Sequence, residues 1–98
     1  MLIYVGHCFG GKAENIEKAK KITHDLQVKD LAKCYICPLL TFSHLEYGEI
    51  GFDAKIELCL DILSECEKMI VASEISKGVQ MEIDFAKLIG MEVQYLDT

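Results

Sequence analysis

The chain has 98 residues, enough for one small domain with a single core, and its net charge is −6 with a sequence pI near 4.9. An acidic chain without a basic stripe excludes general binding to nucleic acid, because nothing neutralises the phosphate backbone. No apolar run approaches the roughly 18 residues that cross a bilayer, so we expect no membrane contact.

Strand-like and helix-like patterns alternate along the chain. Short apolar runs predict strands, and apolar residues at helical spacing predict helices. The expected elements are, in chain order, a strand Met1–Val5, a helix Ala13–Val28, a strand Cys34–Cys37, a loop Leu39–Gly51, a helix Asp53–Ser64, a strand Lys68–Ala72, a helix from Ser76 to Gly90 and a strand Met91–Leu96. In the last helix the residues expected to face the core are Val79, Ile83, Ala86, Leu88 and Ile89.

This alternation predicts an α/β fold. We expect a small Rossmann-like, flavodoxin-like fold of three layers, formed by residues 1–98 as one domain, with a four-stranded parallel sheet of order 2-1-3-4 and helices on both faces. In such sheets, ligands bind beyond the carboxyl ends of the strands, where the strand order switches. The turns expected to meet there are Gly6–Lys12, Leu39–Gly51 and Ser73–Gly78.

The five cysteines suggest reduced thiols in a cytoplasmic protein, because their number is odd and no secretory apolar region stands at the N-terminus. Cys34 and Cys37 have C-x-x-C spacing, which is also found in metal knuckles and redox motifs. A zinc site needs a second pair, and Cys59 and Cys66 are seven residues apart, so we favour structural thiols and expect no metal and no cofactor. The spacing of Cys59 and Cys66 is two helical turns along one stripe, which predicts that both pack in the core.

Glycines surround the end of the first expected strand. Gly6, Gly10 and Gly11 allow a turn whose N–H groups approach a phosphate or a sugar, although the spacing matches neither a dinucleotide fingerprint nor a Walker loop. Because the chain has no arginine, a phosphate would need such N–H groups, hydroxyls, lysine, histidine or a partner chain. A plain connecting loop is the alternative interpretation.

Several stretches together resemble a known superfamily. They are IYVGHCFGG, ENIEKAKKI, LCLDILSECEKMIV and SKGVQMEIDFAKLIGMEV, with Cys37-Pro38 and an aromatic loop between the second and third. In this order they resemble small phage and prophage domains of unknown function (DUF4406-like), which are related to nucleoside 2-deoxyribosyltransferases and deoxynucleoside 5'-monophosphate N-glycosidases. The most informative pattern is S-x-G-x-x-x-E-x-x-x-A, met by Ser76, Gly78, Glu82 and Ala86.

The resemblance implies a catalytic pair. In that superfamily the glutamate attacks the anomeric carbon and a tyrosine of the first strand orients it, which implies Glu82 as nucleophile and Tyr4 as its partner. We expect the nearby helix N-terminus to lower the pKa of Glu82 and keep it ionised. Serine at position 76, where the transferases have aspartate, implies a nucleotide substrate over a free nucleoside, because a second carboxylate would repel a phosphate.

The carboxylate that holds the sugar hydroxyl in the transferases has no match in register, because Cys59 falls near its position. Candidates on the same expected helix are Asp53, Glu57 and Asp61, each of which is equally consistent with a solvated helix face.

Further ligand contacts are expected from side chains in the turns. His7 is our first candidate and His44 the second, because a departing base must be protonated or hydrogen-bonded. Aromatic side chains of Phe9, Phe42 and Tyr47 are suited to stacking on a base, or else cover the sheet edge or a subunit interface. The full set of expected substrate-binding residues is Gly6, His7, Phe9, Gly10, His44, Tyr47, Ser76 and Gly78.

We therefore predict cleavage of an N-glycosidic bond, by hydrolysis or transfer, in a nucleotide or nucleotide-derived signal. The alternative is a nucleotide-binding or sequestering module with the same pocket and no turnover, serving in phage counter-defence. A structural subunit that pairs with a partner is the third interpretation. The expected partner is a small-molecule nucleotide, and an apolar fraction of 51% in a small chain is consistent with a homo-oligomer.

Overall fold

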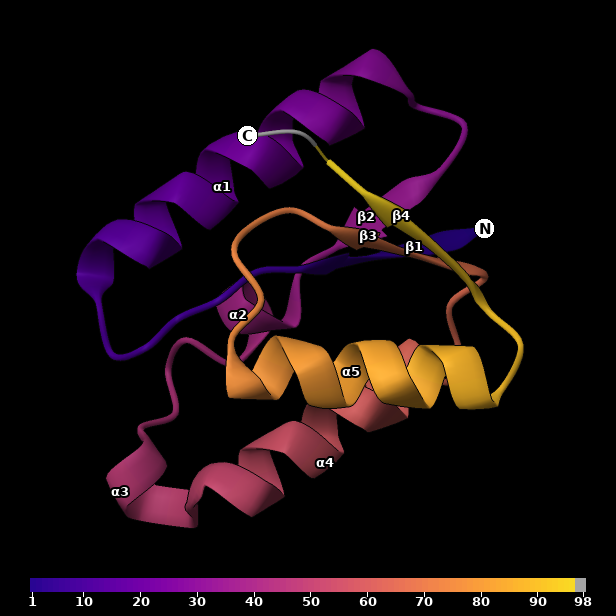
Figure 1. The fold of residues 1–98 in the computed structure, drawn as a ribbon. Helices are drawn as coiled ribbons and strands as arrows, with labels where there is room; N and C mark the ends of the chain where they lie inside the picture. Colours follow the sequence, from indigo (N-terminus) through magenta and orange to yellow (C-terminus); the bar gives the residue numbers. More distant parts are fainter. Residues whose placement is uncertain (97–98) are drawn as a thin grey trace.

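The computed structural model describes residues 1–96, except for the side chain of Tyr47. Its elements follow the expected alternation (Figure 1). They are β1 Leu2–Gly6, α1 Ala13–Lys29, β2 Cys34–Ile36, α2 Pro38–Thr41, α3 Tyr47–Ile50, α4 Phe52–Leu63, β3 Lys68–Val71, α5 Lys77–Leu88 and β4 Glu92–Tyr95.

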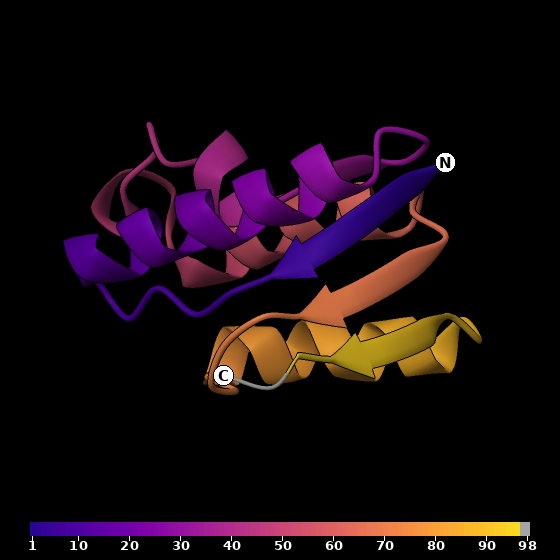
Figure 2. The same ribbon diagram turned by 90° about the horizontal axis from the view of Figure 1, so that it is seen from above.

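The four strands form one parallel sheet of order β2-β1-β3-β4, which confirms the predicted topology. Tyr4 of β1 is paired with Ile36 of β2 on one side and with Met69 of β3 on the other. Seen from above, β1, β3 and β4 point the same way (Figure 2). The carboxyl ends of the strands therefore meet at one edge, where the order switches between β1 and β3.

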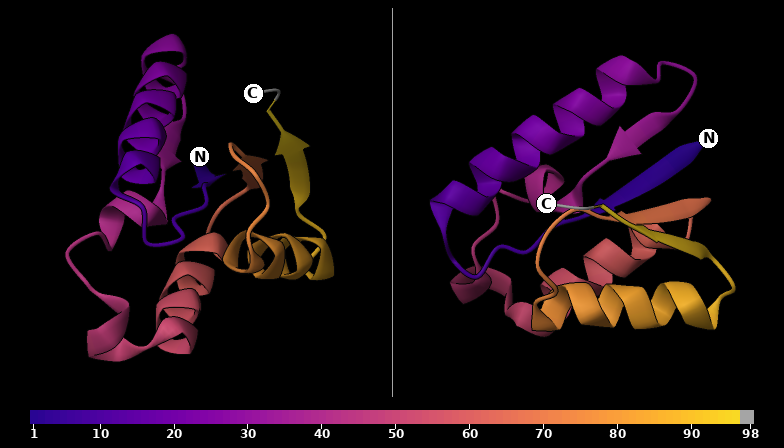
Figure 3. Two further views of the ribbon diagram at one scale, coloured as in Figure 1. Left: turned by 60° about the vertical axis from the view of Figure 1, so that its left-hand side comes forward. Right: turned by 45° about the horizontal axis from the view of Figure 1, so that its top comes forward.

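Helices cover both faces of the sheet, with α1 on one face and α4 and α5 on the other (Figure 3). Side chains alternate between the faces along β1. Tyr4 belongs to the core beneath α4 and α5, together with Leu63, Met69 and Ile83, whereas Val5 belongs to the core beneath α1. Most charged side chains of the helices face the solvent, whereas Lys55 of α4 and Glu82 of α5 are buried.

The segment expected to be one loop contains two short helices, α2 and α3, so that prediction was wrong in part. Pro38 stands at the first position of α2, where its fixed φ is suited to a helix start and its missing N–H costs nothing. The Phe42 N–H closes the turn on the Pro38 carbonyl oxygen at 2.9 Å. A helix of one turn has too few residues to reveal a period in the sequence.

The prediction of which residues of the last helix face the core was also wrong at the C-terminal end of that helix. Val79, Ile83 and Ala86 are buried as predicted, but Leu88 is 83% exposed and Ile89 is 47% exposed. The helix ends at Leu88, and Gly90, with a φ of 78°, turns the chain back towards the sheet. Leu88 lies about 200° around the helix axis from Ala86, which places its side chain on the solvent side.

The cysteines are all free thiols, and their burial differs. Cys37, Cys59 and Cys66 are buried, which confirms the prediction that Cys59 and Cys66 pack in the core, while Cys8 is half-buried and Cys34 is exposed. Within residues 1–96 no helix combines the length and the apolarity required to cross a membrane.

Candidate functional site

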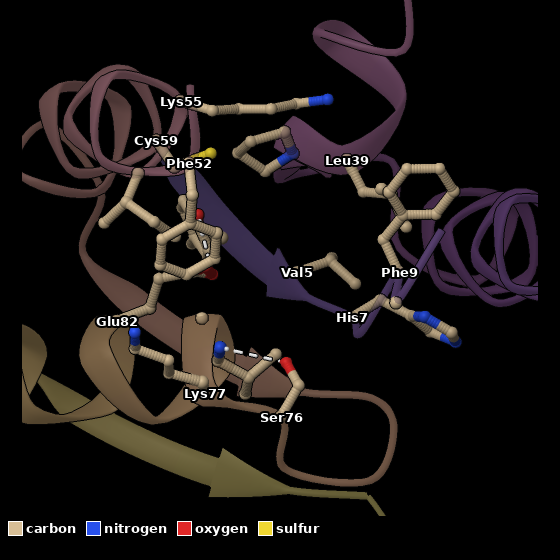
Figure 4. Close-up of a pocket in the computed structure, with 16 residues that line it drawn as sticks. Val5, His7, Phe9, Leu39, Phe52, Lys55, Cys59, Ser76, Lys77 and Glu82 are labelled. Carbon is tan, nitrogen blue, oxygen red and sulfur yellow. Dashed lines mark hydrogen bonds between the residues drawn. The ribbon is translucent and has the colours of Figure 1, made fainter. Parts of the chain in front are cut away.

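A cavity of about 230 Å³ opens at the carboxyl edge of the sheet, between the end of β1, the first turns of α4 and the start of α5 (Figure 4). Seven of the predicted site residues line it: Tyr4, His7, Phe9, Gly10, Ser76, Gly78 and Glu82. Glu82 and Lys77 lie at one side of the cavity, and His7 and Phe9 lie at the other (Figure 4).

Glu82 and Tyr4 are hydrogen-bonded, although they are 78 residues apart in the chain. The Tyr4 hydroxyl donates to Glu82 Oε1 at 2.9 Å, and the two residues are only 1% and 7% exposed respectively. Tyr4 points to this face because it alternates with Val5 along β1, and Glu82 stands beside Val79 and Ile83 on the buried stripe of α5. A carboxyl group thus occupies a position that packing alone would give to an apolar residue.

Burial raises the pKa of Glu82 to about 7, and the hydrogen bond from Tyr4 acts in the opposite direction. The expectation that the helix N-terminus keeps this pKa low was therefore wrong, because Glu82 lies inside the second turn of α5, where desolvation dominates. Near pH 7 the group passes between its neutral and ionised forms. Such a group at a cavity wall is typical of a functional site.

Two neighbouring groups stay protonated at the same pH. Burial, together with the charge of Glu82, raises the pKa of Tyr4 well above its usual value, so its hydroxyl remains a donor. Burial and the charge of Glu82 also raise the pKa of the Cys59 thiol to about 12. Glu82 is accordingly the group of this trio that changes its charge in the physiological range.

Ser76 and Gly78 form the entrance to α5. The hydroxyl oxygen of Ser76 caps the helix by accepting from the Val79 N–H at 3.3 Å. Gly78 allows close packing against α4, because a Cβ there would stand 3.2 Å from Ile56 Cδ1. The ammonium group of Lys77 lies 5.1 Å from the centre of the Phe52 ring. A cation and a capped helix start thus flank the mouth of the cavity.

Lys55 is a site residue that sequence reasoning missed. It is only 6% exposed, lines the cavity from α4, and donates from Nζ to the Leu45 carbonyl oxygen at 2.9 Å. Its ammonium group lies 5.6 Å from the centre of the Phe9 ring. The one available signal was its place next to Ile56 on the apolar stripe of α4, where a lysine is unusual.

Two other predicted residues, His44 and Gly6, do not line the cavity. His44 is exposed on the turn after α2 and does not line it, and Tyr47 has a side chain that falls outside the described part of the chain. Gly6 lies behind the cavity wall, where a Cβ would stand 3.8 Å from Glu82 Oε1 and 2.8 Å from Met69 Cε. Its role is therefore close packing of the backbone beside Glu82.

The candidates for the sugar-hydroxyl carboxylate are solvated. Asp53, Glu57 and Asp61 are all exposed on α4, and none of them lines the cavity. The α4 wall is formed by other side chains of that helix: Phe52, Lys55, Ile56 and Cys59. Within residues 1–96, no group of three or more histidine, cysteine, aspartate or glutamate side chains is arranged to hold a metal ion.

Comparison with known proteins gives one family. A family model described as a domain of unknown function (DUF7768) matches residues 1–96. No curated protein matches the sequence. The matching description names neither the deoxyribosyltransferases nor the N-glycosidases, so the resemblance to them stays a prediction.

Proposed function

The chain belongs to the DUF7768 family, a domain of unknown function, and we propose that it cleaves an N-glycosidic bond in a nucleotide or nucleotide-derived signal, with Glu82 as nucleophile. The observation that carries this proposal is the buried Glu82 carboxyl group at the cavity wall, held by the Tyr4 hydroxyl at 2.9 Å. Burying an ionisable group among apolar side chains costs stability, and such a cost is usual where the group has a chemical task.

The proposed reaction has two steps. A carboxylate oxygen of Glu82 forms a bond to the anomeric carbon while the C–N bond breaks, and the electron pair leaves with the base, which takes a proton from water. Water or an acceptor hydroxyl then attacks the same carbon, loses a proton, and releases the Glu82 carboxylate. Both steps pass through a sugar with positive charge at the anomeric carbon, which the adjacent carboxylate stabilises.

The burial of Glu82 suits this task. Only the ionised form is a nucleophile, and a pKa of about 7 leaves a large fraction ionised at neutral pH. Because Glu82 is only 7% exposed, its carboxylate acts more strongly on a developing positive charge than it would in solution. The protonated Tyr4 hydroxyl holds one carboxylate oxygen, which leaves the other oxygen to face the sugar.

The test is incubation of the wild type and of Glu82→Gln with nucleosides, deoxynucleoside monophosphates and cyclic ADP-ribose isomers. Chromatography then reports release of free base or consumption of the ligand. Base release by the wild type alone supports the proposal, and equal release by both proteins contradicts it. Asp84→Asn is the matched control, because it removes an exposed carboxylate two residues further along the same helix.

A nucleotide-sequestering module is the second candidate function. The observation that favours it is the α4 wall, which presents Lys55 and Cys59 to the cavity and leaves Asp53, Glu57 and Asp61 in solvent. A site without a carboxylate for the sugar hydroxyl retains a bound ligand but lacks one group that aids turnover. Intact ligand bound with similar affinity by the wild type and by Glu82→Gln supports sequestration over cleavage.

A further inference from the structure

A second cavity borders the cavity beside Glu82, on the other side of the β1–α1 connection. The second cavity measures about 460 Å³ and lies between the first half of α1 and the start of the β3–α5 connection. His7 lines both cavities. A smaller hollow of about 200 Å³ shares Gly10 and Ser76 with the first cavity, and Lys12 and Asn15 with the second.

Hydrogen bonds hold the β1–α1 connection, which lies between the two cavities. The Cys8 N–H donates to Ser73 Oγ at 2.8 Å, which joins the β1–α1 connection to the β3–α5 connection. Asn15 Nδ2 donates to the Phe9 carbonyl oxygen at 2.7 Å, which ties the same connection to α1. The β1–α1 connection, which forms the boundary between the two cavities, is therefore fixed in place.

His7 stands at the boundary between the two cavities. Its Nδ1 stands 2.8 Å from the Cys8 carbonyl oxygen, and because a carbonyl only accepts, Nδ1 carries the proton. The side chain is only 9% exposed. His7 therefore keeps one ring orientation at the boundary that the two cavities share.

The charged side chains that line the two cavities favour binding of an anion. Five of the ten lysines in this acidic chain line the two large cavities: Lys12, Lys18, Lys21, Lys55 and Lys77. Only three of the sixteen acidic residues do so: Glu14, Glu74 and Glu82. Three of these lysines line the second cavity, against two glutamates.

The sizes of the cavities favour a ligand that extends beyond the cavity beside Glu82. Sites for small molecules usually measure about 300 to 1,000 Å³, so the 230 Å³ beside Glu82 is small for a whole nucleotide. The second cavity, at 460 Å³, lies within that range. A ligand that fills both has its glycosidic bond at one end and several negative charges at the other.

We propose that the substrate is a nucleoside with two or more linked phosphates, as in a nucleoside diphosphate or a dinucleotide, whose phosphate-bearing half occupies the lysine-lined second cavity. This inference rests on the proposed function for the placement of the glycosidic bond at Glu82. Because the chain has no arginine, these lysines supply the positive charge for phosphate binding.

The test compares ligands that differ in phosphate number. AMP, ADP and NAD⁺, together with the mono- and diphosphates of the other bases, are titrated by calorimetry into the full chain, both as wild type and as Glu82→Gln to prevent turnover. We expect the favoured diphosphate or dinucleotide to bind at least tenfold more tightly than its monophosphate, with an affinity that falls more steeply as salt is added.

Paired variants locate the effect. Lys18→Gln with Lys21→Gln removes two exposed charges from the second cavity, and we expect binding of the diphosphate to weaken roughly tenfold while the monophosphate changes less than about twofold. The matched control is Lys20→Gln with Lys29→Gln, which makes the same charge change on exposed residues of α1 outside the cavities and leaves both affinities unchanged.

Several outcomes overturn the proposal. The first is equal affinity for mono- and diphosphates, and the second is the same loss of diphosphate affinity in both lysine-pair variants. The third is binding of inorganic pyrophosphate at the second cavity while a nucleoside diphosphate is also bound, because the second cavity then holds a separate anion. Base release measured alongside separates this inference from the proposed function. Release from monophosphates without a diphosphate preference overturns the inference alone, whereas a diphosphate preference without any release overturns the proposed function alone.

Discussion

The two cavities at the carboxyl edge of the sheet are built in opposite ways. In the first cavity the charged group, Glu82, is buried, and desolvation raises its pKa. Its hydrogen-bond partner Tyr4 comes from β1, 78 residues away in the sequence. Beside Lys18 and Lys21 the charges are exposed on one helix and remain hydrated. A buried charge acts strongly and depends on packing, whereas exposed charges act weakly, are screened by salt and tolerate substitution.

The largest expected effect is on catalysis. Glu82→Gln removes the nucleophile but keeps an acceptor for the Tyr4 hydroxyl, so we expect base release to fall at least about a thousandfold, equivalent to roughly 4 kcal/mol. The measurement is chromatographic release of base under single-turnover conditions. Asp84→Asn is expected to retain wild-type rates, and a residual rate near wild type in Glu82→Gln would remove Glu82 from the chemistry.

The next effect is on stability as pH changes. The pKa of Glu82 is about 7 when folded, against 4.5 as its ordinary value, so the folded state binds more protons between these pH values and stability falls as pH rises through that window. We expect the unfolding free energy of the wild type, relative to Glu82→Gln, to fall by roughly 2 to 3 kcal/mol from pH 5 to pH 8.

Urea unfolding followed by circular dichroism measures this difference at each pH. Asp84→Asn serves as the control, because its exposed carboxyl group should leave the pH profile parallel to that of the wild type. A difference between wild type and Glu82→Gln that is flat across the window would mean that Glu82 is hydrated in the folded protein.

A smaller effect is expected from Tyr4→Phe. Loss of the hydroxyl removes the hydrogen bond that lowers the pKa of Glu82, so that pKa rises further and the pH profile of kcat/KM shifts to higher pH. At pH 7 we expect kcat/KM to fall roughly tenfold, the usual loss for one hydrogen bond to a charged group.

The matched control is Tyr35→Phe on the neighbouring strand β2, where the hydroxyl donates to Asp30 Oδ2 at 3.1 Å away from the cavity. A pH profile that shifts equally in both variants would indicate a general effect of losing a tyrosine hydroxyl, not an effect on Glu82.

The smallest expected effect concerns Ser76, at the mouth of the first cavity. Ser76→Ala removes the cap of α5 and should lower the unfolding free energy by about 1 kcal/mol. Ser64→Ala is the control, because its hydroxyl only donates to the Asp61 carbonyl oxygen on an exposed turn. Thermal unfolding compares the two, and an equal change in both would show that the Ser76 cap contributes nothing specific.

The amino-acid sequence alone determined the order of the four strands and the three long helices, the parallel sheet of order 2-1-3-4 and most of the buried stripe of α5. These features depend on local spacing and on general rules of chain connection, which a sequence displays directly. Cys59 and Cys66 were placed in the core from their helical spacing, and both are buried, although Cys66 lies beyond the end of α4.

Tertiary structure alone decided the properties of the site. The pKa of Glu82 and the burial of Lys55 beside Phe9 arise from atoms that are far apart in the chain. The contact between Tyr4 and Glu82 does so too, and at the level of sequence only the family resemblance implied it. Desolvation depends on everything packed around a group, so spacing within one helix cannot report it. The position of Glu82 near the helix N-terminus predicted a lowered pKa, but desolvation by the packed core raises it.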